Sequence, residues 1–266
     1  MKSQLVLQDD HPEWGVQSTQ DIGLKASQKA IRGLQYVGGV DLSFIVGNNE
    51  DAIASLIVLS FPDFKVVYED HVKVKLTLPY IAGFLAFREV DPLLSLIQSL
   101  QAKRPELVPQ VILVDGCGIL HPRGFGLASH LGLVSGIPTV GCSKNYLVIG
   151  GDGPLLATKP TDLKTMFHNH IEDESTKGVM YLQGQVTGKV YGAALAAQTK
   201  SGGHKNAIFV SIGHRVSLET SLALVRACSL YRVPEPIRQA DLKSRSEIRK
   251  WVAKEGTILQ RPSNNE

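Results

Sequence analysis

The sequence predicts an α/β fold in which a mixed sheet, three antiparallel strands followed by parallel strands, is flanked by helices. Residues 35–77 contain three segments of strand character separated by turn-forming residues, which is typical of an antiparallel meander. Residues 111–114 are four consecutive apolar residues, as in a strand that is buried on both faces. Helical patterns alternate with the later strands, which favours parallel strands joined through helices.

The first three strands are expected at residues 35–46, 52–60 and 65–77. In the first strand, the even-numbered residues from Val40 to Val46 share one apolar face, which leaves Asp41 on the other face. The first two strands form a hairpin, and the third alternates apolar and polar side chains, so one face of the meander should be exposed to solvent. A carboxylate between apolar neighbours costs free energy unless another group compensates its charge, and Asp41 is therefore a candidate functional residue.

The later elements follow from their capping residues and apolar patterns. Asp91 and Pro92 predict the start of a helix, because aspartate caps helices and proline is favoured at the first helical position. Glu89 would then stand just ahead of that helix. Further elements are expected at residues 137–142 (a strand), 179–196 (a hairpin), 207–212 (a strand), 217–230 (a helix capped by Ser217) and from Ser244, where Ser244 and Glu247 form a capping box for a short basic helix. This order of elements is that of a ribonuclease-H-like mixed sheet.

The stretch from residue 111 to 132 is the centre of the prediction. Its buried strand runs directly into Asp115, and a glycine-rich loop containing His121 and Arg123 follows before apolar residues resume at helical spacing. Glycine lets the backbone approach a ligand closely, and ligands bind at such strand ends in open α/β sheets. Asp115 could alternatively cap the next helix, but that helix begins several residues later, beyond Arg123.

Length and composition favour a single domain. The 266 residues, 20% of them charged, contain no linker or charge block. We expect one domain over residues 1–266, with residues 1–30 as an N-terminal arm and residues 149–178 as an insertion on the rim. Three widely spaced cysteines support neither a disulfide framework nor a zinc site. The net charge of +3 permits a polyanionic partner without requiring one.

The sequence carries no signal for a membrane. No apolar run approaches the roughly 20 residues that cross a bilayer, and the first residues lack a signal-peptide core. We therefore expect no membrane partner and a location in the cytoplasm, with the nucleus or nucleolus as alternatives. We also expect a monomer.

Three carboxylates occupy particular places in this fold. Asp41 lies on the first strand, Glu89 at the entrance of the first long helix, and Asp115 at the tip of the fourth strand. In a sheet of this order the first and fourth strands are neighbours, so the two aspartates would converge while Glu89 approaches from the covering helix. Oxygen-only sites suit Mg²⁺ or Mn²⁺, which can promote phosphodiester hydrolysis. Glu89 is alternatively a solvated charge at a helix end.

Two basic side chains also follow predicted strands. Lys144 could neutralise a phosphate, and His214 could serve as an outer metal ligand or as an acid or base. Each has a simpler interpretation, Lys144 as a surface lysine and His214 as a loop histidine with satisfied hydrogen bonds. Their placement at strand ends together with the three acids favours the functional interpretation.

Several motifs resemble those of the endonuclease V family over about residues 30 to 245. These motifs are Val-Gly-Gly-Val-Asp41, Pro79-Tyr80 leading to Phe87-Arg88-Glu89, the long motif from Asp115 through His121 to His130, Gly141-x-x-Lys144, and Gly213-His214-Arg. The resemblance implies that Asp41, Glu89 and Asp115 are the catalytic acids that bind metal, and that Lys144 and His214 assist them. It also implies cleavage at the second phosphodiester bond on the 3′ side of a deaminated purine, chiefly inosine.

The same resemblance implies the residues that bind substrate. Residues 79–82 (Pro79, Tyr80, Ile81 and Ala82) would form a wedge that separates strands beside the lesion, and Tyr80 could stack on bases. Ala82 stands where the bacterial pattern has proline, which softens the tip of the wedge. A pocket for the displaced hypoxanthine would be lined by Gly83, Leu85, Gly116, Gly126, Leu127 and Leu147, with Gly118, His121, Arg123 and Ser143 as further substrate-binding residues. Some of these glycines could serve only turns.

The segment at 149–178 and the sequence Pro-Glu-Pro-Ile-Arg-Gln-Ala-Asp241 are similar to those of animal members of the family, which act on inosine-containing RNA. The resemblance therefore implies a Mg²⁺-dependent endoribonuclease, with Mn²⁺ as a substitute ion, that cleaves inosine-containing single-stranded RNA. One alternative is a DNA repair endonuclease specific for deoxyinosine. Another is a non-cleaving reader of inosine in RNA, against which the intact acidic triad argues.

Overall fold

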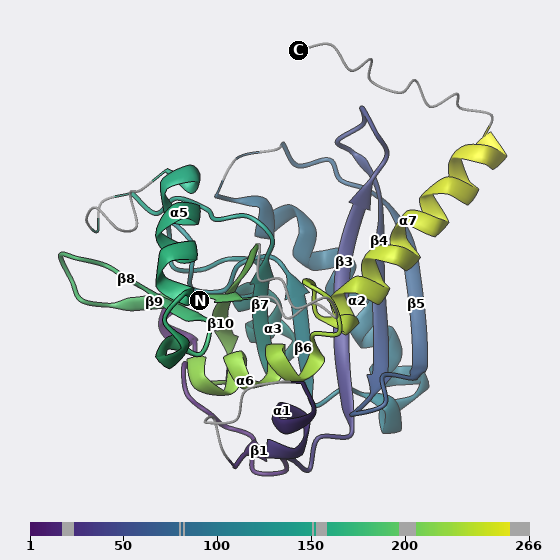
Figure 1. The fold of residues 1–266 in the computed structure, drawn as a ribbon. Coiled ribbons are helices and arrows are strands. Elements are labelled where there is room, and N and C mark those ends of the chain that lie inside the picture. Colours follow the sequence, from purple (N-terminus) through teal and green to yellow (C-terminus); the bar gives the residue numbers. More distant parts are fainter. Residues whose placement is uncertain are drawn as a thin grey trace.

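The computed structural model describes residues 1–17, 24–79, 81, 83–150, 152, 159–196 and 206–255. Its centre is an eight-stranded mixed sheet with strand order β5-β4-β3-β6-β7-β10-β9-β8, and helices cover both faces (Figure 1). The strands are β3 (Tyr36–Phe44), β4 (Asp51–Ser60), β5 (Val66–Lys75), β6 (Val111–Asp115), β7 (Thr139–Ser143), β8 (Val179–Gln183), β9 (Val190–Ala196) and β10 (Ala207–His214). The helices are α1 (Leu24–Ala30), α2 (Leu85–Lys103), α3 (Leu127–Ser135), α5 (Pro160–Ile171), α6 (Leu218–Cys228) and α7 (Glu235–Glu255). The predicted fold class is confirmed.

The register of β3 against β6 sets the position of the two aspartates. The two strands are parallel and pair Val40 with Val114, so the following residue on each strand, Asp41 and Asp115, stands at the same edge of the sheet. The strand β6 also pairs in parallel with β7, with Asp115 opposite Cys142. The prediction that the first and fourth strands are neighbours in the sheet is therefore confirmed.

Both faces of β6 are buried, which explains its run of apolar residues. Val111 and Leu113 pack in a core with α6 and the first turns of α7, whereas Ile112 and Val114 pack in a second core with α2 and α3. Among the described residues, no helix combines the length and the apolar composition needed to cross a bilayer.

The helix α2 begins earlier than the sequence predicts. It starts at Leu85, so Pro92 lies inside it and Glu89 lies in its second turn rather than ahead of it. Proline at this position removes one backbone hydrogen bond. Ala86 and Val90, however, extend the buried stripe that continues at Leu93, and this burial offsets the lost bond.

The prediction of a capping box at Ser244 is wrong, because α7 starts nine residues earlier, at Glu235. Ser244 is completely buried in the middle of α7. The helix crosses β3 and β4 on one face of the sheet (Figure 1), so it covers part of the meander face that was expected to be solvated. Lys243 of α7 pairs with Glu69 of β5 at 2.9 Å.

Close packing of α7 against β3 depends on Gly39. A Cβ atom at this position would lie 2.1 Å from both the carbonyl carbon and the carbonyl oxygen of Pro236, which is far inside van der Waals contact. The bare glycine backbone therefore lets the beginning of α7 rest directly on the strand that carries Asp41.

The segments named as arm and insertion pack against different parts of the sheet. Residues 15–16 and 31–32 form a small two-stranded sheet, β1 (Gly15–Val16) and β2 (Ile31–Arg32), and Trp14 is buried in the core beside them. At the β8 edge of the sheet, α5 packs Leu163 and Phe167 into a core with β8 and β9. The division of the chain into domain, arm and insertion stays a prediction.

The strand β3 is shorter than the sequence predicts. Val46 lies beyond its end and is exposed, so the prediction that Val46 shares the apolar face of this strand was wrong.

Candidate active site

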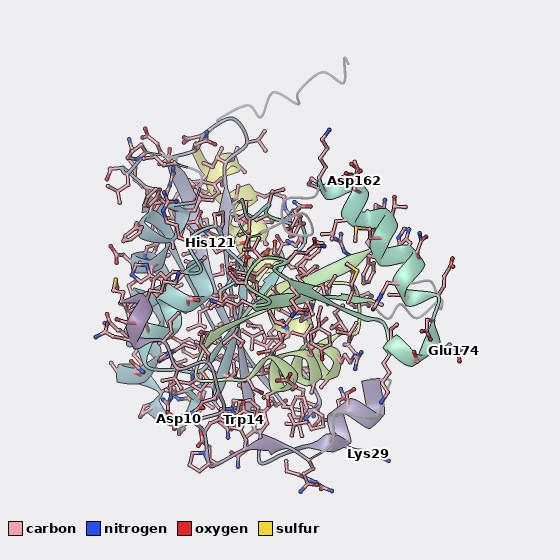
Figure 2. The ribbon with its side chains drawn as sticks, turned by 90° about the vertical axis from the view of Figure 1, so that its left-hand side faces the viewer. Asp10, Trp14, Lys29, His121, Asp162 and Glu174 are labelled. Carbon is pink, nitrogen blue, oxygen red and sulfur yellow. The ribbon has the colours of Figure 1, made fainter. Side chains whose placement is uncertain are left out.

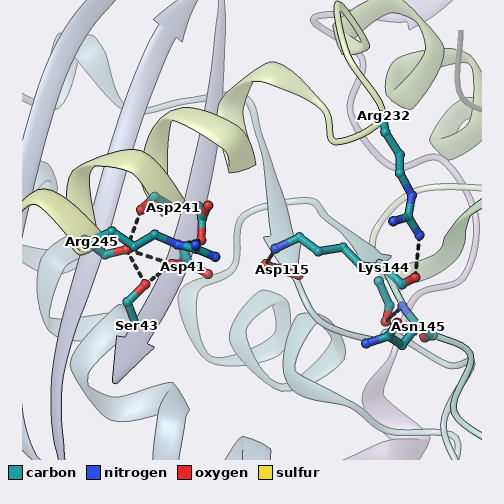
Figure 3. A network of polar contacts seen from close by, with 10 residues as sticks. Asp41, Ser43, Asp115, Lys144, Asn145, Arg232, Asp241 and Arg245 are labelled. Carbon is teal, nitrogen blue, oxygen red and sulfur yellow. Dashed lines mark hydrogen bonds and ion pairs between the residues drawn. The ribbon is translucent and has the colours of Figure 1, made fainter. Parts of the chain in front are cut away.

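A cluster of carboxylates lies at the edge where β3 and β6 end. Asp41 on β3 is only 7% exposed, and Asp115 ends β6. Asp41, Asp115 and a further acid, Asp241 on α7, line one open hollow of about 470 Å³, and Figure 3 places the side chains of Asp41 and Asp241 next to each other. Strand register brings the first two acids together, and the packing of α7 adds the third.

The acids influence one another's ionisation. Burial, followed by the charges of Asp115 and Asp241, raises the pKa of Asp41 to about 6. Burial likewise raises the pKa of Glu89 to about 7, and the charges of Asp41 and Asp115 add to this effect while Arg88 opposes it. The structure therefore places Glu89 within the electrostatic field of the two aspartates, although it comes from α2.

Two hydroxyl groups hold Asp41. Ser244 donates a hydrogen bond to Asp41 Oδ2 at 2.8 Å, and the hydroxyl of Ser43 lies 3.1 Å from the same oxygen. The two hydroxyls are 2.7 Å apart. These bonds favour the ionised carboxylate and so oppose the effect of burial on the pKa of Asp41.

Asp241 and Ser244 were missed as site residues, although a signal for them is present. Ile237, Ala240, Ser244 and Ile248 repeat at helical spacing and are all buried. A serine within such an apolar stripe indicates a buried polar partner on the sheet. Asp241 is the residue directly after Ala240 of this stripe. Its carboxylate accepts a hydrogen bond from Arg245 Nε at 2.8 Å.

Lys144 reaches the acids from the end of β7. Its ammonium group donates to Asp115 Oδ2 at 2.7 Å (Figure 3). Partial burial alone would lower the pKa of Lys144, but the bond to Asp115, together with the charges of Asp115, Asp241 and Asp41, raises it. Lys144 therefore remains a cation beside the carboxylates, as its predicted phosphate-neutralising role requires.

His214 is not brought to the acids. The strand β10 runs antiparallel to β7 and pairs His214 with Thr139, at the opposite end of β7 from Cys142, the partner of Asp115. His214 Nδ1 accepts a hydrogen bond from the backbone N–H of Val6 at 3.2 Å. Figure 2 places Asp10 and Trp14 of this N-terminal segment far from His121. His214 thus fits its simpler interpretation as a histidine with a satisfied hydrogen bond.

A purine-sized cavity of about 290 Å³ opens beside the acids. The predicted substrate-binding residues that line it are Gly83, Leu85, Gly116, His121, Leu127, Ser143 and Leu147. Glu89 and Asp115 also line this cavity, so it adjoins the carboxylate cluster directly. Burial and the charge of Arg123 lower the pKa of His121, which favours its neutral form.

Gly118 and Gly126 do not line this cavity. A Cβ atom at Gly118 would lie 1.9 Å from the carbonyl oxygen of Ile212, and one at Gly126 would lie 2.3 Å from that of Cys117. These glycines let one part of the protein backbone approach another closely. This agrees with the simpler interpretation, in which such glycines serve the fold and do not contact the substrate. The structure gives both glycines a packing role, and their prediction as substrate contacts stays a prediction.

The predicted wedge lies only partly within the described residues, because Tyr80 and Ala82 are outside them. Pro79 is exposed, and Ile81 has 50% of its surface exposed. Arg123 stacks over the ring of Phe84 at 3.6 Å and donates to the carbonyl of Gly83 at 3.3 Å. Arg123 therefore holds the base of the wedge segment against the glycine-rich loop.

The donor set of the cluster suits a hard divalent cation. Within the part of the chain that the structure describes, no group of three or more histidine, cysteine or acidic side chains is positioned to hold a metal ion. The four carboxylates are nevertheless close enough for their charges to raise the pKa values of Asp41 and Glu89. A cation between them would relieve this repulsion, and oxygen ligands are those that Mg²⁺ prefers.

The fold and the carboxylate cluster define a class of enzyme, an α/β nuclease that hydrolyses phosphodiester bonds. The family model described as Endonuclease V matches residues 17–242, and a human Endonuclease V is 45% identical over 227 residues, which are 85% of this chain and 76% of the human protein. The chain belongs to the Endonuclease V family.

Solved structures agree with this assignment. The crystal structure of human ENDOV has a TM-score of 0.79 at 42% sequence identity, covering 94% of each chain. The structure of Ciona intestinalis Endonuclease V, in complex with a 24mer DNA containing an inosine followed by a ribo-adenosine, has a TM-score of 0.78 at 35% identity, again covering 94% of each chain. The likeness therefore extends across nearly the whole fold.

Proposed function

We propose that this protein is a Mg²⁺-dependent endoribonuclease that cleaves inosine-containing single-stranded RNA at the second phosphodiester bond 3′ to the inosine. The observation that carries the proposal is that the carboxylate cluster adjoins the purine-sized cavity. Asp115 and Glu89 belong to both of them. An RNA strand whose hypoxanthine occupies the cavity would place its sugar-phosphate backbone beside the acids.

The carboxylates of Asp41, Glu89, Asp115 and Asp241 would hold the cation, for which Mn²⁺ is the expected substitute. When bound, the cation would supply an activated water and stabilise charge on the leaving oxygen. Lys144, which lies beside Asp115, would neutralise a phosphate oxygen of the substrate. Ser244 orients Asp41 through its hydrogen bond.

Recognition of hypoxanthine would rest on shape and on backbone groups. Gly83 and Gly116 line the cavity without side chains, so backbone atoms can approach the edge of a base that has no exocyclic amine. Leu85, Leu127 and Leu147 supply apolar walls. Tyr80 would stack on a neighbouring base, as the sequence resemblance implies.

A second candidate function is a deoxyinosine-specific DNA repair endonuclease. The Ciona relative is described in complex with DNA, yet with a ribo-adenosine after the inosine, which favours a ribonucleotide at that position. A non-cleaving inosine reader is disfavoured, because such a protein would have no need for four clustered carboxylates. The expectations of a monomer and of a cytoplasmic location, with nucleus or nucleolus as alternatives, stay predictions.

Matched oligonucleotides test the proposed function. RNA and DNA of one sequence, each with a single inosine or with guanosine instead, would be incubated with Mg²⁺, Ca²⁺ or a chelator. We expect cleavage of the single-stranded inosine RNA with Mg²⁺ only, because Ca²⁺ fills oxygen sites with a looser geometry. Efficient cleavage of deoxyinosine duplexes with inert RNA would establish the DNA alternative.

Replacing Ser244 with Ala should raise the Mg²⁺ concentration that cleavage requires, without unfolding the protein. The substitution removes the hydroxyl that orients Asp41, and loss of such a partner to a metal ligand typically costs about 10- to 100-fold in metal affinity or activity. The measurement is a Mg²⁺ titration of the cleavage rate, with circular dichroism to check the fold. Ser246→Ala, on the same helix, is the control. An unchanged Mg²⁺ midpoint for Ser244→Ala would remove Ser244 from the site.

Stabilisation of the protein by Mg²⁺ should increase with pH. The pKa values of Asp41 and Glu89 are raised to about 6 and about 7, so the folded metal-free protein favours their neutral forms. The stability that these groups contribute is fully present below their ordinary pKa values of 3.8 and 4.5, and it is lost as pH rises from there through the raised values of about 6 and about 7. Mg²⁺ requires the ionised forms and would restore this loss. We expect a larger rise in Tm with Mg²⁺ at pH 8 than at pH 6, and an equal rise at both would contradict the assignment.

A further inference from the structure

A second cavity, of about 390 Å³, lies beside residues 144–146, between α5 and β10. Its walls include Tyr146, Phe167 and Phe209. It shares Asn145 and Tyr146 with the purine-sized cavity, and it shares Lys144 with the hollow that contains the acids. The segment 144–146 is therefore a common wall between this cavity and both parts of the active site.

The interior of this second cavity suits a flat aromatic group. Leu163 and Phe167 of α5 are 1% and 2% exposed, and they form part of its apolar lining. The rings of Tyr146 and Phe209 lie with their centroids 5.7 Å apart, tilted by 43°. Aromatic surfaces of this kind accept any nucleobase, because every base has a π face.

The polar part of the lining suits an anion. Lys164 and Arg232 contribute positive charges, and among the described lining residues there is no carboxylate. The ammonium group of Lys144, in contrast, is paired with Asp115 at 2.7 Å. Arg232 Nη2 donates to the carbonyl oxygens of Lys144 at 2.7 Å and Ala207 at 2.9 Å, and Figure 3 shows its side chain reaching the backbone of Lys144. Because both acceptors are uncharged, these bonds hold the guanidinium in place without neutralising it.

We propose that this cavity is a second nucleotide subsite, which binds a base and its phosphate from the substrate strand on the 3′ side of the inosine. The inference rests on the proposed function. If hypoxanthine occupies the first cavity and the cleaved bond lies 3′ to it at the acids, the strand continues past Lys144. The second cavity adjoins this point of the acid-lined hollow through Lys144, and its aromatic and cationic lining matches a nucleotide.

If this subsite exists, the affinity of the protein for inosine RNA should depend on one particular base on the 3′ side of the inosine. A series of inosine RNAs would each carry one abasic nucleotide, at successive positions on the 3′ side and on the 5′ side. Their dissociation constants would be measured by fluorescence anisotropy in Ca²⁺, and their cleavage in Mg²⁺. We expect one 3′ abasic position to weaken binding by about tenfold, since base stacking on aromatic side chains contributes substantially to affinity. Uniform binding of all 3′ variants, or a loss confined to the 5′ side, would overturn the proposal.

A pair of lysine variants on α5 tests the cationic part. Lys164 lines the cavity, whereas Lys159 precedes the same helix, is exposed and does not line it. We expect Lys164→Ala to weaken binding of the intact RNA several-fold and to reduce the salt dependence of binding, while Lys159→Ala leaves both unchanged. Equal behaviour of the two variants would overturn the role of Lys164 in the subsite.

The two proposals fail in different ways. If the wild-type protein does not cleave inosine RNA, the proposed function fails. If it cleaves inosine RNA while neither the 3′ abasic series nor Lys164→Ala changes its affinity, only the second subsite fails.

Discussion

Replacing Asp41 with Asn should lower the rate of inosine-RNA cleavage by on the order of 10³-fold, because a metal ion contributes several kcal/mol of transition-state stabilisation and each 1.4 kcal/mol corresponds to a factor of ten. The substitution keeps the shape of the side chain and removes its charge at the centre of the carboxylate cluster. Its hydrogen-bonding neighbours Ser43 and Ser244 can still contact the amide oxygen. The fold and the purine-sized cavity should therefore persist.

Single-turnover kinetics in Mg²⁺ and anisotropy binding in Ca²⁺ separate the two expectations for Asp41→Asn. We expect cleavage to be lost and RNA affinity to change by no more than a few-fold. The matched control is Asp91→Asn, which removes an exposed carboxylate from α2 outside the cluster. If Asp41→Asn cleaves at a rate similar to that of the wild-type protein, the assignment of the cluster as the catalytic centre is wrong.

Replacing Gly39 with Ala should destabilise the protein and also impair cleavage, although Gly39 lies outside the cluster. The added Cβ would stand 2.1 Å from backbone atoms of Pro236, and backbone cannot give way as a flexible side chain can. Overpacking of this kind typically costs about 1–3 kcal/mol in the free energy of unfolding. Relief requires α7 to shift away from β3, and this shift would move Asp241 and Ser244 relative to Asp41.

Urea denaturation and cleavage assays on the same preparation test this coupling. The control is Gly150→Ala, because a Cβ at Gly150 would meet nothing within 4 Å, and its unfolding free energy should stay within about 0.5 kcal/mol of the wild-type value. A Gly39→Ala protein with normal stability and normal Mg²⁺ dependence would show that the close contact between β3 and α7 is not required.

Features that depend on local pattern were predicted well from the sequence. The alternation in β5 and the apolar run of β6 follow directly from whether one or both faces of a strand are buried. Ser217 caps α6 as predicted, since its hydroxyl accepts a hydrogen bond from the N–H of Thr220. Asp41 and Asp115 could be placed at one edge, because neighbouring parallel strands end on the same side.

Features that depend on contacts distant in sequence were predicted less well. The helix α2 was expected to begin at Pro92, but burial of Ala86 and Val90 carries it back to Leu85. Ser244 has the sequence signature of a helix cap and is instead a buried partner of Asp41, 203 residues away in the chain. His214 was placed with the acids because it ends a strand, although the direction of that strand could not be known from its own residues.

The sequence by itself determined the family, the adjacency of the first and fourth strands, and the acids Asp41, Glu89 and Asp115 as candidates, because motifs and periodicity are written in neighbouring residues. Only the tertiary structure decided that Asp241 joins them and that His214 does not. The physical reason is the packing of α7 on Gly39 and the antiparallel direction of β10 against β7. The helix packing and the strand direction determine which side chains share an edge of the sheet. Both depend on contacts between residues that are distant in the chain.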